Sequence, residues 1–81
     1  MKELIALFNV KKESETKGSV DYEYRAVREN GKLHIECRID ENDPFGWQNA
    51  FATEWDSARE MYGSVEFFYM MLFSTKTTEI K

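Results

Sequence analysis

The amino-acid sequence predicts a small α+β domain in which one helix packs on one face of a four-stranded, mainly antiparallel sheet, in the order β–β–β–α–β. Two observations carry this prediction. Alternating apolar and polar runs flank Asn30-Gly31, the strongest short signal for a β-hairpin. A helix-start signal, Asp43-Pro44, then precedes a stripe of apolar residues at helical spacing. The 81 residues suffice for a single domain, residues 1–81.

The first strand is predicted over residues 2–11, because apolar residues occupy both of its faces. Ile5 and Leu7 would share one face. The other face would carry the alternate residues Leu4, Ala6, Phe8 and Val10. A helix over 2–8 is the alternative, but this stretch is short and has no capping residue. The charged and small residues of 12–19 are predicted to form a loop.

The register of the hairpin follows from its turn. Asn and Gly tolerate the positive φ of a type I′ turn, and residues equally distant from that turn lie opposite each other. One face then carries the apolar and aromatic pairs Tyr22/Ile39, Tyr24/Cys37 and Ala26/Ile35. The other face carries the pairs Glu23/Arg38, Arg25/Glu36, Val27/His34 and Glu29/Lys32, most of which join opposite charges. A slip of one residue would exchange the faces, so this agreement supports the register.

The helix is predicted over residues 44–62, with Asp43 as its N-cap, Pro44 in its first turn and Gly63 just past its end. The last strand is predicted from about 64 to 78. Its first half, VEFFYMMLF, is apolar on all sides, and its second half is rich in threonine. A continuation of the helix beyond Gly63 is the alternative for this segment.

Composition restricts the classes of function. The chain carries 15 acidic and 11 basic residues, and its net charge of −4 argues against direct binding to nucleic acid, which requires a basic surface. An acidic chain instead suits a basic protein partner. The longest apolar run, Phe67 to Phe73, is far too short to span a bilayer, and the N-terminal apolar run is too short for a signal peptide. We therefore expect no membrane partner and a cytoplasmic location.

Few side chains could carry catalysis or hold a metal. His34 is the single histidine and Cys37 the single cysteine, and the register places them on opposite faces of the hairpin. His34 is therefore expected on the surface and Cys37 in the core. The acidic group of Asp40, Glu41 and Asp43 lacks the glycine and the distal glutamate of a calcium loop. We expect no enzymatic activity, no cofactor and no metal.

The first and last strands are apolar on both faces, although one helix covers only one face of the sheet. If the two strands are neighbours, Ile5 and Leu7 join one alternate set of the last strand. That set is either Phe68, Met70 and Leu72 or Val65, Phe67, Tyr69, Met71 and Phe73. The set turned away from the helix would form an apolar patch, and such patches usually mark an interface. A segment of this chain, a second copy or a foreign partner could cover it.

The sequence therefore predicts a small acidic protein-binding module. Its contacts are expected on the second face of the outer strands, in the acidic segment after the hairpin, and at a tryptophan that we expect to be exposed. The residues are Asp40, Glu41, Asp43, Trp47, Ile5, Leu7, Phe68, Met70 and Leu72. The acidic members would bind a basic, nucleic-acid-binding surface of a host protein or complex and block it.

In its general profile the chain resembles the small inhibitors encoded by phages and mobile elements, anti-CRISPR proteins among them. The shared features are short length, acidic charge, many aromatic residues and no catalytic motif. This resemblance implies a function as an inhibitor. The alternative is a self-associating structural or accessory protein, a homodimer that buries the same apolar patch.

Overall fold

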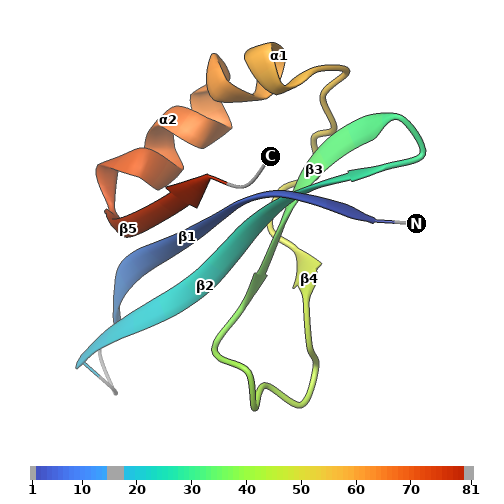
Figure 1. The fold of residues 1–81 in the computed structure, drawn as a ribbon. Coiled ribbons are helices and arrows are strands. Elements are labelled where there is room, and N and C mark those ends of the chain that lie inside the picture. The colour runs from blue at the N-terminus through green and yellow to red at the C-terminus, as the bar shows by residue number, and fades with distance from the viewer. Residues whose placement is uncertain (1, 15–17, 80–81) are drawn as a thin grey trace.

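The computed structural model describes residues 2–14 and 18–79 and shows an α+β fold (Figure 1). Its antiparallel sheet has four longer strands, β1 (Glu3–Ser14), β2 (Gly18–Glu29), β3 (Lys32–Arg38) and β5 (Ser74–Glu79), and a strand of two residues, β4 (Gln48–Asn49). The strand order is β4-β3-β2-β1-β5. Two short helices, α1 (Ala58–Tyr62) and α2 (Val65–Leu72), follow one another between β4 and β5.

The predicted register of the β2–β3 hairpin is confirmed. Asn30 and Gly31 form the turn with positive φ angles of 55° and 80°. Opposite charges face each other along the strands as the turn predicts. Strand β3 ends at Arg38, so the predicted Tyr22–Ile39 pair lies beyond the end of the ladder.

Strand β1 is also confirmed, and it runs further than predicted, which shortens the predicted loop of 12–19. A β-bulge between Leu4 and Ala6 shifts its register against β2. Ile5 consequently packs against the core, whereas Leu7 lies on the other face. The prediction that these two residues share a face is wrong, because one extra residue in the strand interrupts the alternation.

The predicted helix over 44–62 is wrong for most of its length. Residues 44–57 form turns, strand β4 and an irregular segment, and only α1 is helical. Within the irregular segment, Trp55 pairs with Leu33 of β3 through two backbone hydrogen bonds of 2.8 Å each. Pairing with the edge of β3 satisfies backbone groups that a helix would satisfy internally, while the Trp55 side chain still reaches the core.

The predicted strand over 64–78 is also wrong in its first half, which forms helix α2, while its second half forms β5 beside β1. Ser64 lies between the end of α1 and the start of α2. Its hydroxyl oxygen accepts a hydrogen bond from the Phe67 N–H at 3.2 Å as the N-cap of α2, and its O–H donates to the Met61 carbonyl at 2.6 Å. The single predicted helix is thus replaced by two short helices that meet near Ser64.

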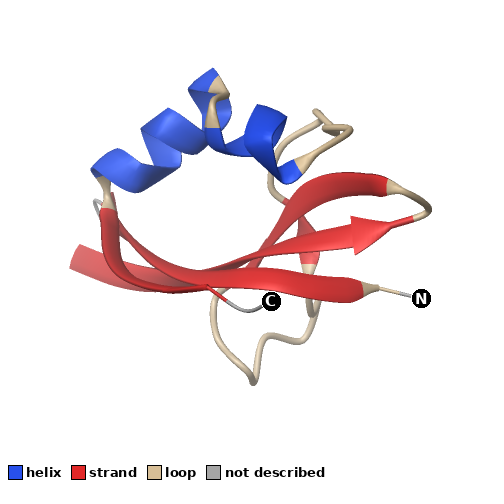
Figure 2. Cartoon of the chain, turned by 45° about the horizontal axis from the view of Figure 1, so that its top comes forward, coloured by secondary structure: helices blue, strands red, loops and turns tan. Residues whose placement is uncertain are grey.

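The core lies between the two helices and one face of the sheet (Figure 2). Phe67 of α2 packs edge-on against Phe8 of β1, with ring centroids 5.4 Å apart, and against Tyr62 of α1 at 4.8 Å. Cys37 is half-buried against this core. The buried residues of the cluster are Ala6, Phe8, Val10, Tyr24, Ala26, Leu33, Ile35, Trp55, Met61, Phe67 and Met70.

Replacement of Ser64 tests its role at the start of α2. We expect Ser64→Ala to lower the free energy of unfolding by about 1 kcal/mol, because an N-cap acceptor is lost. Ser64→Thr keeps the hydroxyl and should retain most of the stability. Urea denaturation followed by circular dichroism measures both variants, and a Ser64→Ala protein as stable as the wild type would contradict this role.

Candidate functional site

Helix α2 is apolar on all sides, but only one of its sides is buried. Phe67 and Met70 face the core, with exposed fractions of 7% and 3%. The opposite side carries residues spaced three and four apart, which fall into one stripe on a helix. Their side chains, and that of the residue after the helix, are 58–68% exposed. We call these residues the α2 patch: Val65, Phe68, Tyr69, Leu72 and Phe73.

The α2 patch is energetically significant for a domain of this size. Full burial of one large apolar side chain contributes about 1.5–3 kcal/mol, whereas a domain of this length has a total stability of roughly 4–12 kcal/mol. Leaving five such side chains largely in water therefore forgoes a burial free energy comparable to the total stability of the fold. Exposed apolar patches of this kind mark interaction sites.

An open pocket of about 470 Å³ adjoins the α2 patch and extends it toward the sheet. Tyr69 and Phe73 belong to both features. The remaining lining comes from β1, β2, α2 and the segment after β4, and consists of Val10, Lys11, Tyr24, Phe51 and Met70. Since Val10 faces the helices, alternation along β1 places the Lys11 side chain on the other face of the sheet. The pocket is therefore walled mainly by apolar and aromatic side chains.

The segment that carries the helices is strongly acidic. Residues 40–66 contain seven acidic residues and a single basic residue, Arg59. Among the described side chains, only Asp56 of these seven forms an ion pair, which it makes with a lysine of β3. Glu66 accepts a hydrogen bond of 2.7 Å from the Thr53 hydroxyl, which lowers the pKa of its carboxyl. The four acids nearest the helices, called the acidic flank, are Glu54, Asp56, Glu60 and Glu66.

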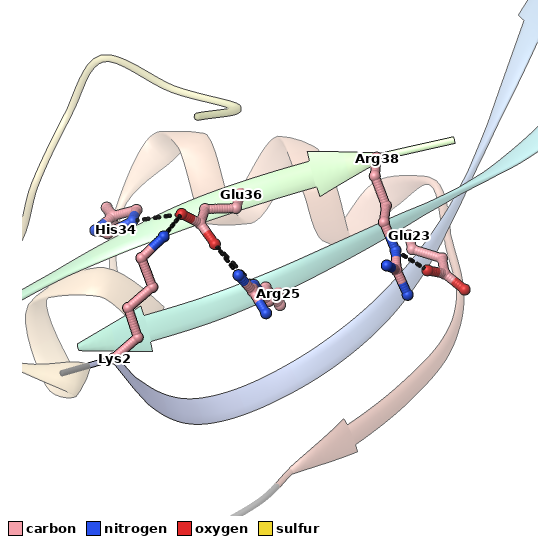
Figure 3. A network of polar contacts seen from close by, with 6 residues as sticks. All are labelled: Lys2, Glu23, Arg25, His34, Glu36 and Arg38. Atoms are coloured by element: carbon pink, nitrogen blue, oxygen red, sulfur yellow. Dashed lines mark hydrogen bonds and ion pairs between the residues drawn. The ribbon is translucent and has the colours of Figure 1, made fainter. Parts of the chain in front are cut away.

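The other face of the sheet carries a charged network around Glu36 (Figure 3). The Glu36 carboxylate accepts hydrogen bonds of 2.7 Å from both Lys2 and Arg25, and His34 Nε2 lies 3.1 Å away from it. Glu36 is 3% exposed and His34 8% exposed. The prediction of a surface histidine is therefore wrong, because the long side chains of the network cover this face.

The Glu36 carboxyl remains ionised in spite of its burial. Burial raises its pKa, but hydrogen bonds from Lys2, His34 and Arg25 outweigh this effect and lower the pKa from 4.5 to about 2. The negative charge is thus held by cationic and hydrogen-bonding neighbours. This arrangement is a structural one, since the donors around Glu36 already use its oxygens.

Trp47 lies on the same face, and two guanidinium groups contact its ring. Arg25 Cζ lies 4.3 Å from the ring centroid and Arg38 Cζ lies 4.4 Å from it, distances typical of cation–π interactions. Arg38 also pairs with Glu23 at 2.5 Å. These contacts hold the segment between β3 and β4 against the sheet. Trp47 is consequently half-buried, and the expectation that it is exposed is wrong.

The structure separates the apolar residues that were predicted as contacts. Phe68 and Leu72 lie together in the α2 patch. Met70 is buried beneath them, because residues two apart share a face in a strand but not in a helix. Ile5 packs against the core, and Leu7 is half-buried on the other face of the sheet.

The predicted acidic contacts lie in the turns that follow β3. Asp40 and Glu41 are exposed. Asp43 accepts backbone hydrogen bonds of 2.9 Å from both Ile39 and Phe45, which lower the pKa of its carboxyl. Asp43 therefore stabilises a turn and does not cap the predicted helix. The Phe45 side chain beside it is 78% exposed, at a distance along the chain from the α2 patch.

The predicted contact residues did not include three members of the α2 patch, Val65, Tyr69 and Phe73, although all three belong to the alternate set of the predicted last strand. The signal was present in the spacing of the run VEFFYMMLF and in Ser64, a residue that favours the N-cap position, directly before it. Eight of these nine positions are apolar, so the run also fits a strand buried on both faces, which is the reading that the prediction preferred.

No protein-family model, curated protein or solved structure matches this chain. Within residues 2–14 and 18–79, no group of three or more His, Cys, Asp or Glu side chains is placed to hold a metal ion. None of the helices described in this range has the length and apolar character needed to cross a membrane. The α2 patch, its pocket and the acidic flank are the surface features on which a functional proposal can be built.

The stability that Glu36 contributes should depend on pH. Its pKa is about 2 in the folded protein and 4.5 ordinarily, so the unfolded chain binds this proton first as the pH falls. The contribution, about 3 kcal/mol, is therefore present above about pH 4.5 and lost as the pH falls toward 2. Glu36→Gln should abolish this part of the pH dependence, which urea denaturation at about pH 7 and about pH 3 measures.

Glu3→Gln is the matched control for Glu36→Gln. Glu3 forms an exposed ion pair with Arg28, and exposed pairs contribute little to stability. The Glu3→Gln protein should therefore follow the wild type at both pH values. Equal responses of the two variants would contradict the special role of the buried carboxylate.

Trp47→Ala should release the segment between β3 and β4. It removes two cation–π contacts, each worth about 0.5–1 kcal/mol at a half-exposed site, so we expect a loss of about 1–2 kcal/mol. Hydrogen–deuterium exchange should accelerate at the Ala50 amide, which donates to the Ile35 carbonyl at 2.8 Å. The Trp55 amide donates to the Leu33 carbonyl at another point of β3, and its exchange should change much less. Unchanged exchange at Ala50 would show that the Trp47 stack does not hold this segment.

Proposed function

We propose that this chain is a protein-binding module that acts by occupying the surface of a partner protein. The observation that carries the proposal is the α2 patch, in which five large apolar side chains are exposed together on and beside one short helix. Aromatic side chains make up three of the five, and aromatic residues are enriched at interfaces and in their hot spots. A partner that covered the patch would recover the free energy that its exposure forgoes.

The acidic flank supports a basic partner. Carboxylates beside an apolar patch attract a basic surface during encounter and reject acidic competitors. Proteins that bind nucleic acid present basic surfaces of this kind. A chain that covered such a surface on a host protein or complex would act as an inhibitor, the function of the phage and mobile-element proteins that it resembles in size and composition.

Self-association is the competing function, because a second copy could cover the α2 patch in a twofold interface. In such an interface the same surface is used by both copies, so the two acidic flanks would approach each other along with the patches. Like charges brought together at an interface oppose binding. This charge distribution favours a basic partner over a second copy.

Charge substitutions within the patch test the proposal. Phe68→Glu and Leu72→Glu place a carboxylate inside the patch, whereas Phe45→Glu makes the same kind of change at an exposed site outside it. In affinity capture from cell extract, we expect the wild type and Phe45→Glu to retain the same basic protein. The two patch variants should retain it at least about tenfold less, equivalent to about 1.4 kcal/mol of binding free energy. Melting curves should show that all four proteins are folded.

Light scattering during size exclusion separates the two functions. We expect the wild type to have the mass of one chain, 9.6 kDa. A wild type with the mass of two chains that returns to one in Phe68→Glu would show that the patch is used for self-association. Equal capture by all four proteins would exclude the α2 patch as the interface.

A further inference from the structure

An open pocket adjoins the α2 patch and belongs to the proposed interface. Its volume of about 470 Å³ lies within the range of roughly 300–1,000 Å³ found for ligand-binding pockets. We infer that this pocket is an anchor site, which takes one large apolar side chain from a partner segment that carries lysine or arginine beside that anchor. The inference rests on the proposed function and adds the chemistry of the segment that binds.

The walls of the pocket favour an apolar anchor. Val10, Tyr24 and Met70 form part of the lining and belong to the buried core. Tyr69 and Phe73 are mostly exposed and form its accessible part. A buried apolar floor with exposed aromatic walls gains free energy when an apolar side chain replaces water there. Interface hot spots have this form, with an aromatic or other large side chain in a desolvated pocket.

Charge near the pocket favours a basic residue next to the anchor. Glu66 lies on the same side of α2 as Tyr69 and Phe73, which follow it at intervals of three and four residues. Its carboxylate is held by Thr53, and the exposed Glu54 is the next residue of that segment. A lysine or arginine flanking the anchor would therefore meet carboxylates, whereas an aspartate or glutamate would be repelled. The same charges disfavour an apolar ligand with an acidic head group.

The test uses the intact chain and three small probes, without any natural partner. The probes are acetyl-Lys-Trp-Lys-amide, acetyl-Glu-Trp-Glu-amide, which presents the same anchor with opposite charges, and decanoate, an acyl chain with a carboxylate. Methyl resonances of Val10 and Met70 report on the pocket in an NMR titration. We expect the basic peptide to shift both resonances with a dissociation constant on the order of 1 mM. The acidic peptide should bind at least about fivefold more weakly, and added salt should reduce this difference.

Three variants localise the binding, and a fourth tests the charge preference. Tyr69→Ala and Phe73→Ala remove exposed pocket walls. Each should weaken binding of the basic peptide about threefold or more, which corresponds to a loss of roughly 0.6 kcal/mol of binding free energy. Val65→Ala is the control, because Val65 belongs to the α2 patch but does not line the pocket. It should leave peptide binding unchanged. Glu66→Gln should bring the affinities of the two peptides closer together.

Several results would overturn the inference. It fails if no probe shifts the Val10 and Met70 resonances, or if the acidic peptide or decanoate binds as tightly as the basic peptide. It also fails if Val65→Ala weakens binding as much as Tyr69→Ala. These failures are distinct from failure of the proposed function, because Phe68→Glu can still abolish capture of a protein partner when no probe enters the pocket.

Discussion

The turn at Asn30-Gly31 is the constraint on which the rest of the structure depends. Positive φ at both positions closes a two-residue turn and sets one register for β2 and β3. In that register Ile35 faces the helices while Glu36 faces the opposite side. A slip of one residue would place a carboxylate in the core. Strand β1 then pairs with β2, and the Trp55 segment pairs with β3, so both extend a sheet whose faces are already assigned.

The two faces of the sheet are covered by different means. Helices α1 and α2 cover one face and bury a core of apolar side chains. On the other face, Arg25 and Arg38 lie against the ring of Trp47, and Lys2 and Arg25 bind Glu36, so long side chains take the place of a second layer of secondary structure. The charges of this network are largely matched within it. It therefore offers a partner less free energy than the uncovered side of α2 does.

The two sides of α2 explain why its sequence is apolar at every position except Glu66. One side contributes Phe67 and Met70 to the core, and the other side presents Phe68 and Leu72 to solvent. A helix that only covered a sheet would place polar residues on its outer side. Phe68 and Leu72, both exposed in the structure, could be named as candidate contacts from apolar density alone. The burial of Met70 could not be predicted in the same way. Residues two apart share a face in a strand but not in a helix, so the prediction depends on knowing that this segment is helical.

By itself, the sequence determined the hairpin turn, the pairing of β2 with β3, and the excess of apolar residues after Ser64. Each of these depends on residues close together along the chain or on a turn that joins them directly. Only the tertiary structure decided that VEFFYMMLF is a helix and that the segment before α1 is not. A short apolar run satisfies the local rules of both helix and strand. The choice depends on partners distant in sequence, such as Phe8 for Phe67 and Leu33 for Trp55, which a local pattern does not contain.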